Sequence, residues 1–306
     1  MKFAIISDIH GNYIALKNIL KDAQKADVDG YIFAGDYCIS APWPSEVINR
    51  MMALNNSYAV LGNEEKYLHL TPGDDGQSEV SYWARRQLRD EQMTWLDGLP
   101  RRIDTTIENV EVHICHPSSE FIDKCEYKFG KTSLLAMHYG DRTPTHEENL
   151  DYVRSQLLAD EEFIAKARSL DKGVYIFGHS HDQFYLEFEG RWFINPGSCG
   201  LPLDCVKFGF PYSILTIEDG IISVEERRIN FDPEELIALA MNTTQFTEAH
   251  VWSEIIFREW RTTKEAIRFF LNNAEEYANS IGDTRRPFAK DTWEEAFLDW
   301  KKKVEG

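Results

Sequence analysis

Side chains that can bind metal ions recur at five places in the first two thirds of the sequence, each directly after a short apolar stretch. They are Asp8 with His10, Asp36, Asn63, His116, and His179 with His181. In open α/β sheets, ligands bind beyond the carboxyl ends of the strands. If each apolar stretch is a strand, five strand ends direct seven candidate ligands toward one rim.

The types of these side chains indicate which metals they would hold. Two Asp, one Asn and four His are oxygen and imidazole donors, a set that suits Mn, Fe or Zn better than soft metals. Seven donors exceed one tetrahedral site and predict two ions that share a carboxylate. Ligands one residue apart can face one cluster only where the backbone bends, and Gly11 and Gly178 make such bends inexpensive. Any one of these patterns alone could be an ordinary turn, but five in this order are typical of a metal site.

The elements that would position these residues alternate between strands and helices. Apolar strands are predicted at 2–7, 31–34 and 58–61, with amphipathic helices at 13–26 and 45–54 and a longer helix at 78–97. This alternation is typical of a layered α/β domain. Further strands, bounded by Gly, Asn or Asp, are predicted at 103–107, 110–115, 174–177, 183–188, 192–194, 212–217 and 222–229.

Two segments interrupt or follow this pattern. Residues 120–170 are long, polar and mostly helical, and predict an insertion within a domain spanning 1–231. Residues 232–306 predict a C-terminal helical extension, in which Trp252 to Phe270 form one amphipathic series and Thr292 to Glu295 form a capping box that opens the last helix. The aromatic face of this extension could pack on the parent domain, line a cleft or form a homodimer.

Composition limits the partners and the compartment. The 306 residues include 33 basic and 51 acidic side chains, a net charge of −18, which disfavours nucleic acid as a partner but not a small phosphorylated molecule. No apolar run approaches the ~20 residues of a membrane span, and the apolar start is too short for a signal peptide. Five cysteines without a CxxC pair suggest free thiols in a reducing compartment, and we expect a cytoplasmic protein.

The five motifs together resemble the signature of calcineurin-like metallophosphoesterases. The stretch from Asn195 to Ser198, Asn-Pro-Gly-Ser, resembles the small bacterial branch, which includes phosphodiesterases and diadenosine tetraphosphate hydrolases. The resemblance covers about residues 1–230. It implies an α/β (α+β) four-layer sandwich, in which two mixed sheets lie between helices, with a binuclear metal centre.

The resemblance also implies a role for each ligand. One metal would be held by Asp8, His10, Asp36 and His181, and the other by Asp36, Asn63, His116 and His179. Manganese or iron is expected most, and zinc is an alternative. A metal-bridging hydroxide would attack a phosphodiester or phosphoanhydride in line with the leaving group. The alternatives are a broad-specificity phosphodiesterase or phosphatase, and a non-catalytic scaffold of the same fold, which the complete ligand set disfavours.

One departure from the family pattern bears on the substrate. Many members carry His after the motif Asn, where this chain has Glu64. A carboxylate beside two cations is a poor general acid, and loss of such an acid typically costs about 10²–10⁴-fold with a basic leaving group. We therefore expect an acidic leaving group, as in an aryl phosphate or a phosphoanhydride such as diadenosine tetraphosphate. His69, His138 and His146 could replace the missing acid, or could be ordinary surface residues.

The insertion supplies a second indication about the substrate. Between Lys124 and Arg142, basic and aromatic side chains alternate, and such a segment could cap the metal site and bind a nucleotide. An ordinary amphipathic helix pair is the alternative. The candidate substrate contacts are Asn12, Glu64, Tyr127, Lys128, Lys131, His138 and Tyr139.

Overall fold

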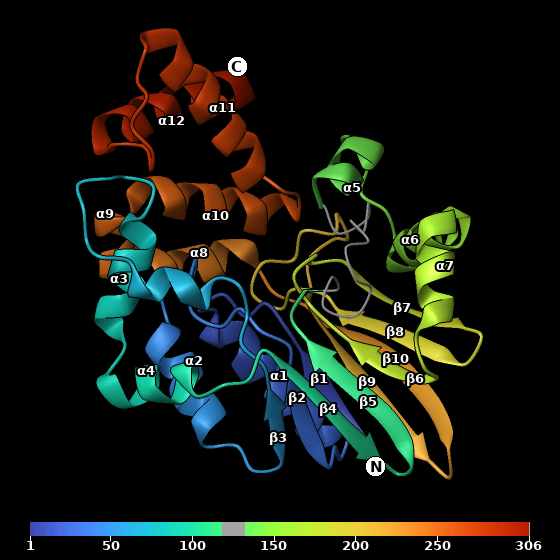
Figure 1. The fold of residues 1–306 in the computed structure, drawn as a ribbon. Helices are drawn as coiled ribbons and strands as arrows, with labels where there is room; N and C mark the ends of the chain where they lie inside the picture. Colours follow the sequence, from blue (N-terminus) through green and yellow to red (C-terminus); the bar gives the residue numbers. More distant parts are fainter. Residues whose placement is uncertain (118–131, 306) are drawn as a thin grey trace.

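The computed structural model describes residues 1–117 and 132–305, which fold around two five-stranded sheets (Figure 1). The first sheet has the order β10-β9-β1-β2-β3, and the second has the order β4-β5-β6-β8-β7. The strands of the first sheet are β1 (Lys2–Ile6), β2 (Gly30–Phe33), β3 (Ser57–Ala59), β9 (Phe210–Glu218) and β10 (Ile221–Ile229). Those of the second are β4 (Arg102–Ile107), β5 (Val110–Cys115), β6 (Gly173–Ile176), β7 (Gln183–Phe188) and β8 (Arg191–Pro196).

Both sheets mix parallel and antiparallel pairs. In the first, β1 pairs in parallel with β2 and antiparallel with β9; in the second, β6 pairs in parallel with both β5 and β8. Their inner faces meet in one buried apolar cluster, to which Ile5 and Ile32 contribute from one sheet and Ile114 and Ile176 from the other. Helices cover both outer faces, so the predicted four-layer sandwich is confirmed.

One set of helices covers the first sheet. It comprises α1 (Tyr13–Lys25), α2 (Pro44–Met52), a 3-10 turn (Glu65–His69), α3 (Glu79–Gln87) and α4 (Asp90–Asp97). The single helix predicted at 78–97 is wrong, because the chain is extended at Leu88 and Arg89. A new helix starts there because the Gln92 side chain accepts from the backbone N–H of Arg89, at 2.9 Å.

The described part of the predicted insertion covers the second sheet. It forms α5 (Thr132–Tyr139), α6 (His146–Ala159) and α7 (Glu161–Ser169). In Figure 1, α6 and α7 lie beside β7 and β8, and α5 lies above them. Phe163 of α7 packs edge-on against Phe193 of β8, with ring centroids 5.3 Å apart. Residues 118–131, which include part of the predicted nucleotide-binding segment, lie outside the described residues.

The C-terminal helices divide between two apolar clusters. They are α8 (Pro233–Met241), α9 (Thr244–Glu248), α10 (His250–Thr262), α11 (Ile267–Ile281) and α12 (Lys290–Glu305). Leu236, Ile237 and Trp260 are buried in the same cluster as Ile9 and Leu16, so α8 and α10 complete the layer over the first sheet. A second cluster joins α10, α11 and α12 (Figure 1).

Two details of the predicted C-terminal region are wrong. The series from Trp252 to Phe270 is broken at Thr263, whose backbone is left-handed with φ of 54°. The last helix begins at Lys290, two residues before the predicted capping box, and the Thr292 hydroxyl donates to the Asp283 carboxylate instead. The bond from Thr292 to Asp283, and the bond from Cys205 N to Thr263 O, join residues that local spacing does not bring together.

The cysteines and the helix lengths bear on the expected compartment. Cys38, Cys115, Cys199 and Cys205 are buried free thiols, and Cys125 lies outside the described residues. Within residues 1–117 and 132–305, no helix has both the length and the apolar content that a bilayer crossing requires.

Truncating Trp260 tests whether α10 belongs to the main core. The indole is fully buried, and its Nε1 donates to Gly200 O at 2.9 Å. We expect Trp260→Ala to lower the free energy of unfolding by about 3–5 kcal/mol, because it leaves a cavity and removes one of the two hydrogen bonds that Gly200 O accepts. Leu298→Ala, at a 57 % exposed position, should change it by less than about 0.5 kcal/mol. Equal urea midpoints for the two variants would contradict this packing.

Candidate metal centre

The seven expected ligands lie on loops that leave both sheets at one end of the sandwich. Asp8 and His10 follow β1, and Asp36 follows β2, both in the first sheet. His116 follows β5 in the second sheet, and the loop after β6 carries two more histidines. The rim predicted from strand ends is therefore shared by two sheets rather than formed by one.

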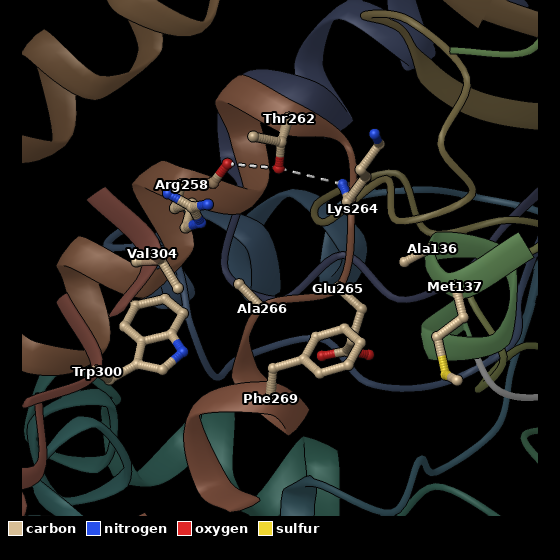
Figure 2. Close-up of a pocket in the computed structure, with 10 residues that line it drawn as sticks. All are labelled: Ala136, Met137, Arg258, Thr262, Lys264, Glu265, Ala266, Phe269, Trp300 and Val304. Atoms are coloured by element: carbon tan, nitrogen blue, oxygen red, sulfur yellow. Dashed lines mark hydrogen bonds between the residues drawn. The ribbon is translucent and has the colours of Figure 1, made fainter. Parts of the chain in front are cut away.

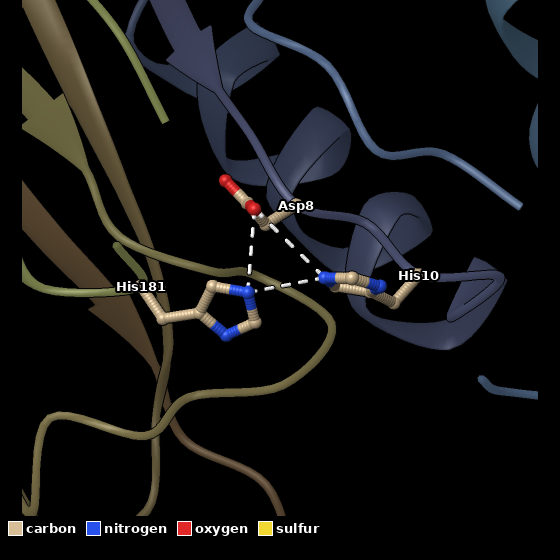
Figure 3. A group of neighbouring side chains, drawn as sticks. All are labelled: Asp8, His10 and His181. Atoms are coloured by element: carbon tan, nitrogen blue, oxygen red, sulfur yellow. Dashed lines mark hydrogen bonds and ion pairs between the residues drawn. The ribbon is translucent and has the colours of Figure 1, made fainter. Parts of the chain in front are cut away.

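One group of possible metal ligands consists of Asp8, His10 and His181 (Figure 3). The Nε2 atom of His181 lies 3.3 Å from Asp8 Oδ1 and 3.1 Å from Nε2 of His10. Nε2 of His10 lies 3.8 Å from the same carboxylate oxygen. Three donor atoms from loops 171 residues apart thus face one point.

A second group consists of Asp36, His116 and His179. Nε2 of His116 lies 3.0 Å from Asp36 Oδ2 and 3.1 Å from Asn63 Oδ1. Asp36 also belongs to a third group, with His10 and Glu64. It therefore lies between the two sets of ligands, at the position where the family resemblance expects a bridging carboxylate.

The backbone at these ligands is strained. Asp8, His10, Asp36, His179 and His181 all have φ between 50° and 69°, a left-handed conformation that costs a non-glycine residue about 1–3 kcal/mol. The ligand residues themselves make the bends that we expected at the glycines. Gly11 does bend with φ of 74°.

Gly178 is needed for a different reason from the predicted bend. A Cβ there would lie 1.9 Å from Ser7 Oγ and 2.4 Å from Asp8 Oδ2. The strained loops are in turn held by backbone hydrogen bonds. The N–H groups of Asp8 and His10 donate to the carbonyls of Gly35 and Asp36, at 3.0 and 3.1 Å, and join the loop after β1 to the loop after β2.

Backbone carbonyls orient three of the four histidines. Nδ1 of His10 lies 3.0 Å from Ile39 O, and Nδ1 of His116 lies 2.6 Å from Ala34 O. Nδ1 of His181 lies 3.0 Å from Leu201 O. A proton on Nδ1 leaves the Nε2 lone pair directed at the carboxylates, which is the usual arrangement of metal-binding histidine. The residues present therefore fit metal ions.

The electrostatics of the cluster favour cations. Burial raises the pKa of Asp8, but the charges of His116, His181 and His10 outweigh it and hold that pKa well below its usual range. Burial lowers the pKa of His10 and His116, yet the neighbouring carboxylates raise both to about 10. The cluster thus concentrates negative charge where imidazole lone pairs converge, and a bound metal ion would replace the protons there.

Sequence reasoning missed a carboxylate that supports the site. Glu65 is buried, and its two oxygens accept from the N–H groups of Tyr37 at 2.6 Å and Gly62 at 2.9 Å. These bonds join the loop after β2 to the loop after β3. Glu65 directly follows the Asn63-Glu64 motif, but its sequence position alone does not distinguish a buried acid from a surface one.

The predicted substrate contacts are placed in several environments. Glu64 lies at the centre, with Oε2 3.1 Å from His10 Nδ1. Asn12 is two residues from His10, but its amide is buried and caps α1, accepting from Ala15 N and donating to Gly200 O. Of the other predicted contacts, His138 and Tyr139 lie on α5. Tyr127, Lys128 and Lys131 lie outside the described residues.

The candidate replacement acids are not among the metal-binding groups of the described residues. The ring of His138 is exposed and stacks on Tyr152 with centroids 3.9 Å apart, while the neighbouring Tyr139 is buried in the cluster over the second sheet. His69 and His146 form ion pairs with acidic residues elsewhere, at 2.9 Å in each case.

Comparison with known proteins agrees with this geometry. The model of the calcineurin-like phosphoesterase superfamily domain matches residues 1–220. The chain belongs to this superfamily. The family suggests hydrolase activity, and the family and the ligand groups together imply divalent metal ions at this site.

Individual relatives of this metallophosphoesterase come from archaea and bacteria. An uncharacterised protein of Methanocaldococcus jannaschii is 25 % identical over 236 residues, which are 75 % of this chain and 87 % of that protein. A metallophosphoesterase structure from Sphaerobacter thermophilus has a TM-score of 0.60 at 22 % identity, covering 86 % of this chain and all of that one. A hypothetical protein of Pyrococcus horikoshii has a TM-score of 0.57 at 12 % identity, covering 87 % and 99 %. The two structural likenesses show that the fold is shared.

Removing one histidine from either group tests whether the groups are separate metal sites. We expect the wild type to bind two metal ions per chain, and His116→Ala or His181→Ala to lose at least one, because each removes a converging Nε2 donor. His69→Ala is the control, since that exposed ring pairs with Asp97 outside the cluster. The measurement is metal content after reconstitution and gel filtration. Unchanged content in both cluster variants would rule out this centre.

Proposed function

We propose that this metallophosphoesterase hydrolyses a phosphodiester or phosphoanhydride at a binuclear centre, acting on a nucleotide such as diadenosine tetraphosphate. The observation that carries the proposal is the convergence of two ligand groups around Asp36, which lies within reach of both. When bound, two metal ions would lower the pKa of a coordinated water and would neutralise charge on the phosphoryl oxygens.

The protein's own residues would prepare this site for an anion. Asp8 and Asp36 are fixed by hydrogen bonds from the backbone N–H groups of His179 and Glu64, so neither carboxylate needs to reorient during turnover. The carbonyl-bound histidines are held in the same way. Such preorganised groups accelerate reactions because little reorganisation remains for the transition state. A cationic centre in a chain of net charge −18 would attract small phosphates while the remaining surface repels nucleic acid.

The position of Glu64 supports an acidic leaving group. Its carboxylate interacts with His10 Nδ1, and its backbone N–H donates to Asp36 Oδ1 at 2.8 Å. The residue that follows the motif Asn therefore supports two ligands of the centre rather than presenting a proton donor. A leaving group that departs as a stable anion, such as a nucleoside polyphosphate or an aryl oxide, needs no such donor.

Two other functions remain as candidates for comparison. A broad-specificity phosphodiesterase would use the same centre on many small esters. A non-catalytic scaffold would keep the fold without needing the ligands, and the retention of all seven ligand residues favours an enzyme.

Metal removal and restoration test the proposal directly. Protein stripped with a chelator should be inactive toward diadenosine tetraphosphate and bis(4-nitrophenyl) phosphate, and Mn²⁺ should restore hydrolysis, with products identified by chromatography. His116→Ala should not recover, because it lacks a ligand. Stripped protein that retains full activity, or metal-loaded protein that cleaves neither compound, would refute the proposal.

Replacing Glu64 tests the leaving-group argument. We expect the wild type to cleave a 4-nitrophenyl phosphodiester far faster than the matching alkyl diester, and Glu64→His to narrow that ratio by about tenfold or more, because imidazole can protonate an alkoxide. Glu64→Gln has a similar size but supplies no acid, so it should leave the ratio unchanged. The kcat/KM ratios are compared at equal metal content. An alkyl diester cleaved by the wild type as fast as the aryl one would contradict the argument.

A further inference from the structure

A cavity of about 230 Å³ lies between α5 and the C-terminal helices (Figure 2). On one side it is lined by Met137 of α5, and on the other by Arg258 of α10, Phe269 of α11 and Trp300 of α12. Met137 and Phe269 are 70 % and 38 % exposed, so two large apolar side chains from separate parts of the fold face the same space. Aromatic and thioether side chains in this arrangement suit a flat ring.

The same cavity contains a guanidinium that is available to an anion. Arg258 is half-buried, and its Cζ lies 5.7 Å from the centroid of the Trp300 ring. Among the described side chains, no carboxylate forms an ion pair with it, whereas the neighbouring Arg261 is paired with Glu234 at 2.6 Å. In a chain with 51 acidic residues, a cation left without such a partner in a cavity is a candidate anion site.

The walls of the cavity are fixed to each other. Lys264 forms a hydrogen bond with Gly140 O at the end of α5, and the Thr262 hydroxyl joins the end of α10 to Lys264 N (Figure 2). Glu265 is the one acidic residue among the described residues that line the cavity, and its Oε1 accepts from Arg268 N at 2.9 Å. The bond from Lys264 to Gly140 therefore joins the two sides of the cavity, and the bonds of Thr262 and Glu265 order the C-terminal side.

A short loop connects the cavity to the metal centre. Asp204 forms an isolated β-bridge with Lys264, and three residues earlier Leu201 O contacts His181 Nδ1. Three residues of chain span at most about 11 Å. The Trp260 indole also donates to Gly200 O, so α10 and this loop are joined at a second point.

We propose that this cavity binds an aromatic ring that carries an anionic group, the chemistry of a nucleotide. The ring lies against Phe269 and Met137, and the anion pairs with Arg258. The ligand is either the nucleoside end of the substrate or a free nucleotide. Binding can be measured without turnover, so this proposal and the proposed hydrolysis can fail independently.

The test is calorimetric titration of AMP into the metal-loaded full chain, with inorganic phosphate titrated separately to measure binding of the phosphate group alone. We expect AMP to bind at least tenfold more tightly than inorganic phosphate or ribose 5-phosphate, which lack the base. Arg258→Gln and Met137→Glu should each weaken AMP at least tenfold. Met137 is strongly exposed, so its replacement leaves the core intact. Arg268→Gln, an exposed residue outside the lining, is the matched control and should bind as the wild type does.

Two further measurements distinguish the sources of the nucleotide. If the cavity holds the substrate's nucleoside end, Arg258→Gln raises KM for diadenosine tetraphosphate at unchanged kcat, and AMP does not affect cleavage of bis(4-nitrophenyl) phosphate. If the cavity holds a free nucleotide, AMP changes the rate at which the wild type cleaves bis(4-nitrophenyl) phosphate. It does not change that rate in Arg258→Gln. AMP that binds no more tightly than inorganic phosphate, or equal affinities for AMP in the wild type and both lining variants, would overturn the proposal.

Discussion

The carboxylates of Asp8 and Asp36 are buried, with imidazole nitrogens of neighbouring histidines 3.0 to 4.0 Å from their oxygens, and this concentration of charge constrains the rest of the structure. Removing charged groups from water is costly unless opposite charges and hydrogen bonds compensate. Here the compensation comes from the facing histidines and from backbone N–H groups aimed at Asp8 and Asp36. A metal ion would complete it.

The two sheets satisfy this constraint because their ligand-bearing loops come together at one end of the sandwich. The group of Asp8, His10 and His181 and the group of Asp36, His116 and His179 each combine side chains from both sheets. The third group, with His10, Asp36 and Glu64, comes from the first sheet alone. The apolar cluster between the sheets therefore sets the distance between the two halves of the centre. Left-handed backbone at five of the ligands is tolerated because hydrogen bonds between the loops, and the buried Glu65, hold it in place.

Much of this arrangement is predictable from residue order. Apolar stretches followed by Asp, Asn or His locate the strand ends, and the metal-binding groups contain six of the seven expected ligands, with Asn63 in contact with His116. The errors arise where distant contacts decide. The break at Leu88 depends on a side-chain cap, and the commitment of Asn12 to α1 on the loop around Gly200. The turn at Thr263 is followed by N–H groups that donate to the Glu259 carboxylate of α10. Spacing along the chain carries no information about such partners.

The separation of the ligands along the chain links cation binding to folding. His10 and His181 are 171 positions apart, and they meet only when both sheets are assembled. An unfolded chain would therefore bind the ions far more weakly than the native one. By mass action, an ion present at 100 times its dissociation constant adds about 2.7 kcal/mol to native stability. The availability of metal would then govern how long the folded chain survives, apart from any role in turnover.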